Sequence, residues 1–277
     1  MIRQKLSIQG KLVDFIEKVV RFTPFTYAAV RWLAGWALYK QLGESDLRLV
    51  KNLLIKSRNP LIIDIGANDG ISSRLFKWHM PACVIVAFEP ATIHRKKLLK
   101  LFKRYKTQDK ASEFISEALS DVYSKATLYT PRVFGIKLHQ ISSLSSIEAA
   151  KNVGEIISSF VKRFELVEEE VICSRLDDRQ LDPDLIKLDV EGHEEAVLRG
   201  SRETLMRARP YIVLEMKPEY SVGIQRFMDT VNYRAISFSE AKGRWEYTSI
   251  TGDVGATFVE NQYFAPSELE LDRPELP

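Results

Sequence analysis

A short aliphatic run that breaks into a glycine-bounded turn constrains this chain more than any other stretch. Residues 61–70 read LIIDIGANDG, and four aliphatic residues surround Asp64 before the turn that Gly66 and Gly70 bound. The run predicts a buried parallel strand, and residues 71–79 predict the start of a helix. Glycine is expected at both positions because a Cβ atom would block close approach or forbid the backbone angles.

Two further apolar runs also end in polar residues. Residues 83–88 lead into Glu89-Pro90, about 20 residues beyond the turn, where an acid is suited to accept hydrogen bonds from two ribose hydroxyls. Residues 114–119 form a third run, which ends in Ser120-Asp121. The carboxyl ends of parallel strands meet at one edge of a sheet, so these residues predict a nucleoside lying across that edge.

The glycine turn differs from the dinucleotide fingerprint Gly-x-Gly-x-x-Gly. Asn68 stands where the second glycine would be, so a pyrophosphate would be poorly held. Asp64 and Asp69 are also unfavourable beside phosphate, but they suit a cationic ligand. S-adenosylmethionine has no phosphate and carries a sulfonium and an ammonium group, and the charges therefore favour it over NAD.

A second acidic cluster follows later in the chain. Residues 185–195 read LIKLDVEGHEE, which again predicts a strand, an acidic tip at Asp189, a glycine and a helix that begins near His193 and Glu194. Residues 211–214 predict the next strand, which is tipped by Glu215. The same edge of the sheet would thus carry several acids.

The composition is ordinary for a soluble globular protein. The 277 residues are 45% hydrophobic and 28% charged, and a net charge of +3 is too small to indicate nucleic-acid binding. Cys83 and Cys173 fall in predicted strands, as expected of small core residues in a reducing compartment. The most apolar stretch, residues 28–39, is too short to span a bilayer, and charged residues interrupt the first apolar ones. We expect a cytoplasmic protein with no transmembrane segment.

The first part of the chain predicts a helical extension over residues 1–57, in front of a main domain over residues 58–277. Helices are expected over residues 2–20, 24–42 and 46–56. Trp32, Trp36 and Tyr39 share one face of the second helix. This face would pack on the main domain, form the interface of a homo-oligomer, line a substrate pocket or lie on a membrane surface.

A strongly basic helix is expected after Glu89-Pro90, over residues 94–106. A solvated helix face explains its lysines and arginines most simply, and contact with RNA or an anionic polysaccharide is the alternative. No aromatic residues alternate with the basic ones on that face, which makes nucleic acid an unlikely partner.

A long insertion interrupts the alternation of strands and helices over residues 122–182. Strands are expected over residues 126–130 and around residues 169–172, with a serine-rich stretch that includes His139 between them. An insertion at the carboxyl edge is the expected place for a lid over the substrate, and a mobile surface loop is the alternative.

Taken together, these motifs resemble the FkbM-type methyltransferases, which are S-adenosylmethionine-dependent O-methyltransferases. The resemblance covers roughly residues 61–264 and leaves the N-terminal helices outside. It implies an α/β, Rossmann-like class I methyltransferase fold, with a seven-stranded, mostly parallel sheet, helices on both faces and an antiparallel last strand. Six motifs in order carry it: residues 64–70, Phe88-Glu89-Pro90, residues 118–121, Leu176-Asp177-Asp178, residues 186–194 and residues 210–215.

With this cofactor, each acid has an expected role. Gly66 and the nearby backbone through Asn68 and Gly70 would approach the methionine part, and Asp64 would hold its ammonium group directly or through water. Glu89 would accept the ribose hydroxyls. Ser120 or Asp121 would accept a hydrogen bond from the adenine amino group.

The acceptor is expected to be a hydroxyl of a sugar, a glycan or another small molecule. A protonated hydroxyl needs a base or a metal ion, and Asp189, His193 and Glu215 are the catalytic candidates. Asp189 and Glu215 would share a Mg²⁺ ion in one alternative, and pair with an arginine or a backbone amide in the other. The stretch after the fourth strand reads Asp189-Val190-Glu191-Gly192 in place of the Asn-Pro-Pro-Tyr of N-methylating enzymes, which favours oxygen as the acceptor. A nucleic-acid methyltransferase and a non-catalytic interaction module are the competing hypotheses.

Overall fold

The computed structural model describes residues 47–109, 111–133, 136–157, 164–248 and 261–271. The helices expected over residues 2–20 and 24–42 lie outside these ranges. The described strands, in chain order, are β1 Leu61–Ile65, β2 Val84–Phe88, β3 Glu113–Ile115, β4 Ala118–Leu119, β5 Ser124–Val133, β6 Ile136–Lys137, β7 Glu165–Ser174, β8 Leu185–Leu188, β9 Tyr211–Glu215, β10 Tyr233–Ser239, β11 Arg244–Tyr247 and β12 Asn261–Pro266. The helices are α3 Ile71–His79, α4 Thr92–Lys106, α5 Ser146–Ile157, α6 Glu194–Arg199, α7 Arg202–Ala208 and α8 Ser221–Thr230, with 3-10 helices η1 Leu47–Asn52, η2 His139–Ile141, η3 Asp177–Arg179 and η4 Pro218–Tyr220.

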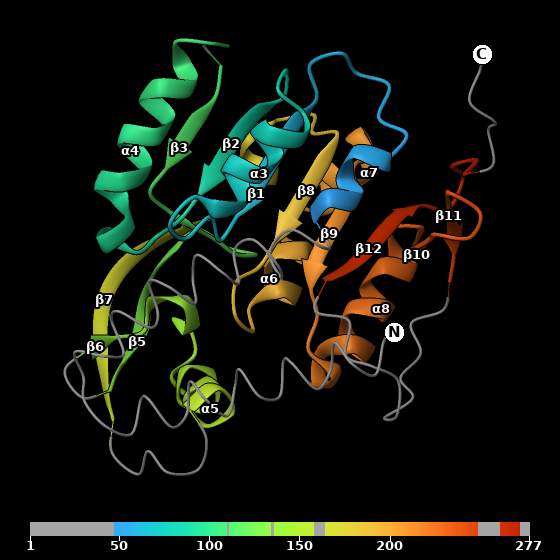
Figure 1. Cartoon of the computed structure of the whole chain (residues 1–277). Helices are drawn as coiled ribbons and strands as arrows, with labels where there is room; N and C mark the ends of the chain where they lie inside the picture. The colour runs from blue at the N-terminus through green and yellow to red at the C-terminus, as the bar shows by residue number, and fades with distance from the viewer. Residues whose placement is uncertain (1–46, 110, 134–135, 158–163, 249–260, 272–277) are drawn as a thin grey trace.

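The main sheet has the order β11-β10-β12-β9-β8-β1-β2-β3 (Figure 1). Strands β3, β2, β1, β8 and β9 are mutually parallel, and β12 runs antiparallel between β9 and β10. This confirms the α/β class, the mostly parallel sheet and the antiparallel last strand. In the described part of the chain, β11 adds an eighth strand at the edge, where it pairs with β10.

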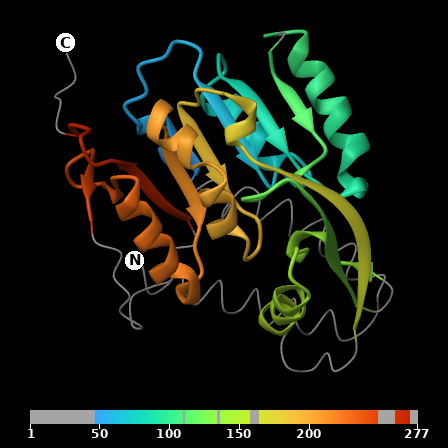
Figure 2. The same cartoon turned by 180° about the vertical axis from the view of Figure 1, so that it is seen from behind.

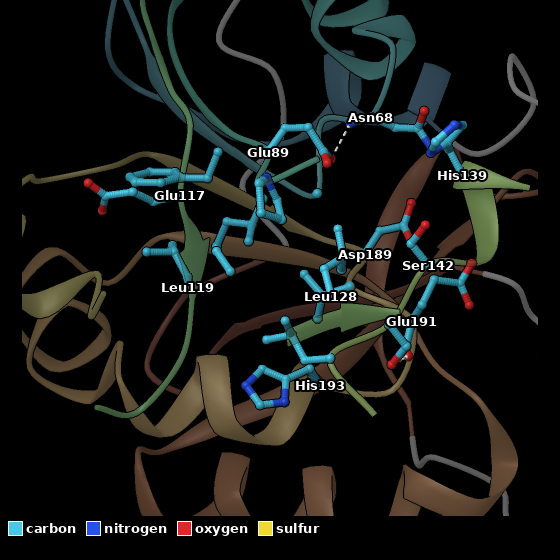
Figure 3. A pocket seen from close by; sticks show the side chains of 18 of the residues that line it. Asn68, Glu89, Glu117, Leu119, Leu128, His139, Ser142, Asp189, Glu191 and His193 are labelled. Carbon is cyan, nitrogen blue, oxygen red and sulfur yellow. Dashed lines mark hydrogen bonds between the residues drawn. The ribbon is translucent and has the colours of Figure 1, made fainter. Parts of the chain in front are cut away.

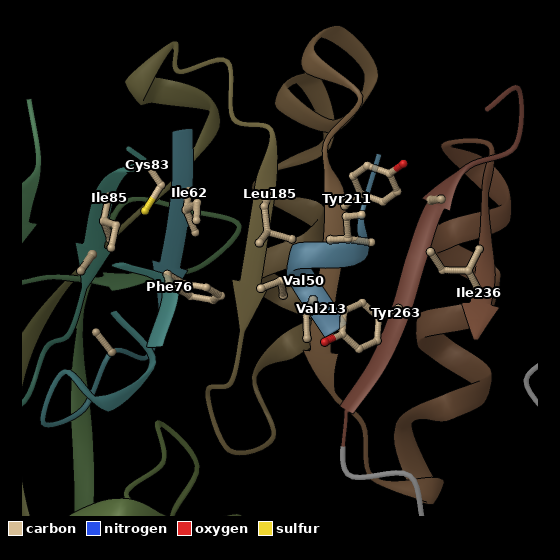
Figure 4. Close-up of a cluster of buried hydrophobic side chains, with 14 of the residues drawn as sticks. Val50, Ile62, Phe76, Cys83, Ile85, Leu185, Tyr211, Val213, Ile236 and Tyr263 are labelled. Atoms are coloured by element: carbon tan, nitrogen blue, oxygen red, sulfur yellow. The ribbon is translucent and has the colours of Figure 1, made fainter. Parts of the chain in front are cut away.

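Helices cover both faces of this sheet, and each face has its own hydrophobic core. Successive side chains of β1 alternate between the two: Ile62 packs with Phe76 of α3, and Ile63 packs in the cluster that holds Leu198 of α6 and Met228 of α8. Figure 4 shows the first cluster, in which Val50 of η1 also lies. Burial on both faces explains why the central strands are mostly apolar in the sequence, with Asp64 in β1 and Lys187 in β8 as the charged residues.

The helix expected over residues 46–56 is shorter than predicted. Its described part is the 3-10 helix η1, which ends at Asn52. The tighter winding places both Val50 and Leu53 in the core beside the sheet, and the chain then extends toward Pro60. Residues assigned to the N-terminal extension therefore contribute to the main core.

The third apolar run is two strands and not one, which corrects the sequence-based expectation. Residues Glu113–Ile115 form β3 of the main sheet, and Ala118–Leu119 form β4, which pairs with β7 in a second sheet. The chain thus leaves the main sheet between Ile115 and Ala118, so Ser120 and Asp121 do not follow a main-sheet strand.

The insertion builds its own sheet, with the order β4-β7-β5-β6. Strands β5 and β7 pair antiparallel over nearly their whole length, and α5 packs beside them. Figures 1 and 2 show this sheet and α5 beyond the carboxyl ends of the main strands. The expectation of a substantial insertion at this edge is confirmed.

Candidate functional site

A cavity lies where the carboxyl ends of β1, β2 and β8 meet the insertion (Figure 3). Its empty space, including the open mouth, is about 630 Å³. The lining comes from the tips of three main strands, the segment after β3, and the insertion from Leu128 onward. The polar and charged residues that line it are Asn68, Glu89, Glu117, His139, Gln140, Ser142, Ser143, Asp189, Glu191 and His193.

Gly66 lines the cavity, but a different contact explains why it is glycine. Its φ is +73°, and a Cβ atom there would lie 1.7 Å from the carbonyl oxygen of Asp189. The residue is therefore glycine because the β1 turn packs against the tip of β8. Gly70, with φ +82°, precedes α3, and a Cβ there would meet the side chains of Leu98 and Leu101. Gly70 is not among the described lining residues.

The structure places Asp64 beneath the cavity and not in its lining. The side chain is fully buried, and its Oδ2 accepts hydrogen bonds from Ser72 Oγ at 2.7 Å and Ser73 Oγ at 2.5 Å. Its Oδ1 lies 3.5 Å from Nζ of Lys187. The two serines tie the first turn of α3 to β1 through Oδ2, whereas Oδ1 has no hydrogen-bond partner among the described residues. The expected contact with the ligand's ammonium group stays a prediction.

Glu89 is held by two backbone donors. Its Oε2 accepts from the amide of Asn68 at 2.8 Å (Figure 3), and its Oε1 accepts from the amide of Ala91 at 2.9 Å. Burial raises the pKa of Glu89 to about 7, although these two donors work against the rise. Each oxygen keeps a further lone pair, so the fixed carboxylate can still accept two ligand hydroxyls.

Ser120 and Asp121 are not brought to the cavity surface. Ser120 Oγ lies 2.9 Å from Nε2 of His193, and Asp121 forms an ion pair with Arg199 at 3.0 Å. Neither is among the described lining residues, whereas Glu117 and Leu119 from the same segment are. The departure of the chain from the main sheet after β3 explains this shift.

Lys187 is a buried cation that links two strand tips, and the sequence reasoning did not single it out. Its Nζ donates to the carbonyl oxygen of Gly66 at 2.8 Å and lies 3.3 Å from Oδ2 of Asp189. It also pairs with Asp64. The apolar residues around it in the sequence mark a buried lysine, which needs an acid partner, and this was the available signal.

Asp189 and Glu215 form a coupled acid pair beside this lysine. Burial raises the pKa of Glu215 to about 10, and the charge of Asp189 adds to the rise. Burial alone would raise the pKa of Asp189 as well, but the Lys187 ammonium outweighs it and holds that pKa below its usual value. At neutral pH Asp189 is therefore the charged member of the pair, and Glu215 keeps its proton.

His193 sits at the start of α6 and lines the cavity, but its Nε2 faces Ser120. Burial lowers the pKa of His193, so the ring is neutral at pH 7. Glu194 Oε1 accepts from the amides of Val190 at 3.3 Å and Gly192 at 3.1 Å. Glu194 therefore fixes the loop after β8 as a first-turn acid.

The insertion contacts the carboxyl edge of the main sheet at Glu191, which follows β8. Ser143 Oγ donates to the carbonyl oxygen of Glu191 at 2.8 Å, and Asn152 Nδ2 of α5 donates to its Oε2 at 3.1 Å. Lys217, which follows β9, lies 3.4 Å from the same carboxylate. Burial raises the pKa of Glu191 to about 7, and the nearby Asp189 adds to the rise. The insertion therefore lines the cavity, through His139 and Ser142 among others, and its action as a lid over the substrate stays a prediction.

Comparisons with known proteins found similar folds among solved structures. A crystal structure of methyltransferase FkbM from Methylobacillus flagellatus KT aligns with 94% of this chain and 60% of its own, with a TM-score of 0.51 and 12% identity. An S-adenosylmethionine-dependent O-methyltransferase from Thermotoga maritima has a TM-score of 0.43 at 10% identity, covering 83% of this chain and 66% of its own. Among curated proteins, no sequence matches.

In the described part of the chain, no helix has both the length and the apolar character needed to cross a bilayer. The fold likeness to the Methylobacillus structure supports the class I methyltransferase architecture described above. The model of the methyltransferase FkbM domain matches residues 64–235, which is more than half of the chain. The chain therefore belongs to the FkbM methyltransferase family.

Proposed function

We propose that this protein is an S-adenosylmethionine-dependent O-methyltransferase whose acceptor is a hydroxyl of a sugar, a glycan or another small natural product. Membership of a methyltransferase family implies S-adenosylmethionine as the methyl donor. The acid pair of Asp189 and Glu215 beside Lys187 is the observation that carries the choice of a hydroxyl acceptor. A hydroxyl needs a base, and this pair provides one that is charged at neutral pH.

The donor side of the cavity would be the tips of β1 and β2. Glu89 is already oriented by the amides of Asn68 and Ala91 and would accept the two ribose hydroxyls. The backbone at Gly66 would border the methionine part. The apolar lining at Phe88, Leu119 and Leu128 would border the adenine. For Asp64, Ser120 and Asp121 the contacts described above favour a supporting role around the cavity.

The acceptor side would be the tips of β8 and β9. When bound, S-adenosylmethionine supplies an electrophilic methyl carbon on a sulfonium. Asp189 would take the proton of the acceptor hydroxyl as the oxygen–carbon bond forms and the sulfur–carbon bond breaks. Glu215, which keeps its own proton, shares a hydrogen bond with Asp189 and orients it. His193, with Nε2 directed at Ser120, would take part in shaping the cavity.

The chemistry of the acid cluster argues against a resident Mg²⁺ ion. Oxygen atoms of Asp189, Glu191 and Glu215 lie within 4.8 Å of one another, as a metal site requires. However, Lys187 already pairs with Asp189, and Lys217 already pairs with Glu191. A divalent cation would meet two ammonium groups at short range, so these residues do not fit it. The reaction proposed here proceeds through proton transfer to Asp189.

The decisive experiment has two stages. Binding of S-adenosylhomocysteine by the full chain is measured by calorimetry, and radiolabelled methyl transfer is then screened over sugars, glycans and small hydroxylated compounds. We expect binding, and transfer to an oxygen, with Asp189→Asn retaining binding and losing transfer. Absence of binding would support the non-catalytic alternative. Transfer to RNA that Asp189→Asn does not impair would contradict the proposed chemistry.

A further inference from the structure

Helix α4 presents an exposed basic surface that no part of the proposed reaction uses. It carries seven lysines and arginines over residues 92–106 and no acid. Leu98, Phe102 and Tyr105 are buried against the sheet, which fixes the helix on the domain. We call the outward side the α4 surface; its members are Ile93, Arg95, Lys96, Lys97, Leu99, Lys100, Lys103, Arg104 and Lys106.

Within the described residues, few charges of the α4 surface have an acidic partner. In the ranges that the structure describes, Lys97 is the one basic residue of α4 with a carboxylate within 4 Å, and that partner is Asp69 at 2.7 Å. Six like charges on neighbouring turns repel one another, which costs free energy unless an anionic partner lies against them.

Two aliphatic side chains interrupt this positive field. Ile93 is 57% exposed and Leu99 is 51% exposed. Single exposed aliphatic residues are common on protein surfaces, but these two lie among cations on one helix. Lysines and arginines that surround exposed aliphatic side chains are the pattern of helices that lie on a membrane interface.

The α4 surface begins beside the cavity. Pro90, two residues before the helix, lines the cavity, and the ring of His94 lies edge-on to His139 of the insertion with 5.5 Å between centroids. A flat partner that covered the first turns of α4 would therefore lie next to the mouth formed by the insertion.

We propose that the α4 surface docks on an anionic phospholipid membrane. Lysine and arginine side chains would meet the lipid phosphates, and each positive charge near such a surface would add to the affinity. Ile93 and Leu99 would enter the interface between the headgroups and the acyl chains. A single-stranded nucleic acid fits less well because its bases need exposed aromatic rings for stacking, and Phe102 and Tyr105 of this helix are buried. Docking does not depend on methyl transfer.

The test uses the full chain and sedimentation with lipid vesicles. One set is neutral phosphatidylcholine, and the other contains about 30 mol% of an anionic phospholipid. We expect binding to the anionic set, weakened at high salt. The triple variant Lys96→Glu, Lys100→Glu and Lys103→Glu should bind at least about tenfold more weakly, since each site loses an attraction and gains a repulsion. The double variant Ile93→Ser and Leu99→Ser should bind more weakly with the same salt dependence.

A matched control reverses three exposed charges elsewhere that have no carboxylate within 4 Å in the described residues: Lys56→Glu and Arg58→Glu before β1, and Arg226→Glu on α8. This control should bind anionic vesicles like the parent chain. Equal binding to neutral vesicles, or an equal loss in the control, would overturn the proposal. Tighter binding to single-stranded RNA than to vesicles, unaffected by the aliphatic variant, would assign the α4 surface to nucleic acid. Thermal unfolding of every variant separates these outcomes from misfolding.

Discussion

The two sides of the cavity hold their acids in opposite ways. On the donor side, Glu89 stands alone and both of its oxygens are fixed by backbone amides. On the proposed acceptor side, Asp189 lines the cavity, Glu215 lies beside it outside the described lining, and Lys187 determines which of the two is charged. The first arrangement suits recognition by a fixed acceptor of hydrogen bonds. The second keeps one carboxylate charged next to a group that retains its proton, and this carboxylate would take up a proton that becomes acidic as the oxygen–carbon bond forms.

Asp189→Asn should strongly reduce methyl transfer and leave cofactor binding nearly unchanged. Loss of the charged base is expected to reduce kcat about 10²- to 10⁴-fold. Affinity for S-adenosylhomocysteine should change little, because Glu89 is untouched. His193→Gln, which leaves Ser120 a partner, is the control and should retain most of the turnover. A His193 variant as inactive as the Asp189 variant would move the base to the histidine.

The main effect of Lys187→Met should be a loss of folding stability. It leaves Asp64 and Asp189 without their buried cation, and removing one partner of a buried pair typically costs about 3–5 kcal/mol. Urea unfolding measures this loss. Lys97→Met, which removes an exposed pair with Asp69, should cost less than about 1 kcal/mol. Adding Asp64→Asn to Lys187→Met should recover part of the stability, and no recovery would mean that the lysine acts by packing alone.

Glu89→Gln should weaken binding of S-adenosylhomocysteine about 100-fold. Hydrogen bonds to a charged group contribute roughly 1.5–3 kcal/mol each, and two ribose hydroxyls lose their charged acceptor. Calorimetry on the variant provides the measurement. Asp121→Asn is the informative companion: its ion pair with Arg199 lies outside the cavity lining, so affinity should be unchanged. A large loss in the Asp121 variant would restore its predicted contact with adenine.

The pH dependence of donor binding should be the smallest of these effects. The pKa of Glu89 is raised to about 7 in the free protein, and ribose hydroxyls bind its ionised form better. Affinity should therefore be constant above about pH 7 and fall by up to about tenfold for each pH unit below it. Titration calorimetry at several pH values would show the fall, and Glu89→Gln should flatten it. If the affinity of the parent chain did not change with pH, the ionised Glu89 carboxylate would be excluded as the acceptor for the ribose hydroxyls.

The sequence predicted what local pattern determines. Strands β1, β2 and β8 are mostly apolar runs with an acid or a glycine at the tip, and each delivers a predicted residue to the cavity: Asn68, Glu89 and Asp189. Contacts between distant segments were not predictable in this way. No periodicity reveals that residues 114–119 divide between two sheets, and the Asp64–Lys187 pair exists only once β1 and β8 are adjacent.

The reasons for individual glycines were also beyond local pattern. Gly66 was correctly identified as a constrained position, and its φ of +73° is the constraint on the backbone angle that we expected. The close contact with the carbonyl of Asp189 is a second constraint, which depends on the fold. The serine-rich insertion was placed at the right edge of the sheet, yet which of its residues would line the cavity depends on the pairing of Tyr129 with Ser143.

The base of the insertion has one more consequence. Leu119 and Ser174 are paired neighbours, and the amide of Ser120 donates to the carbonyl of Ser174 at 2.9 Å. The insertion therefore leaves and rejoins the domain at neighbouring residues. We expect that the segment between Ser120 and Ser174 can be exchanged for another one without moving the strands that hold Glu89 and Asp189. A graft of the corresponding segment from another family member, joined at these residues, should keep cofactor binding and change the specificity for the acceptor.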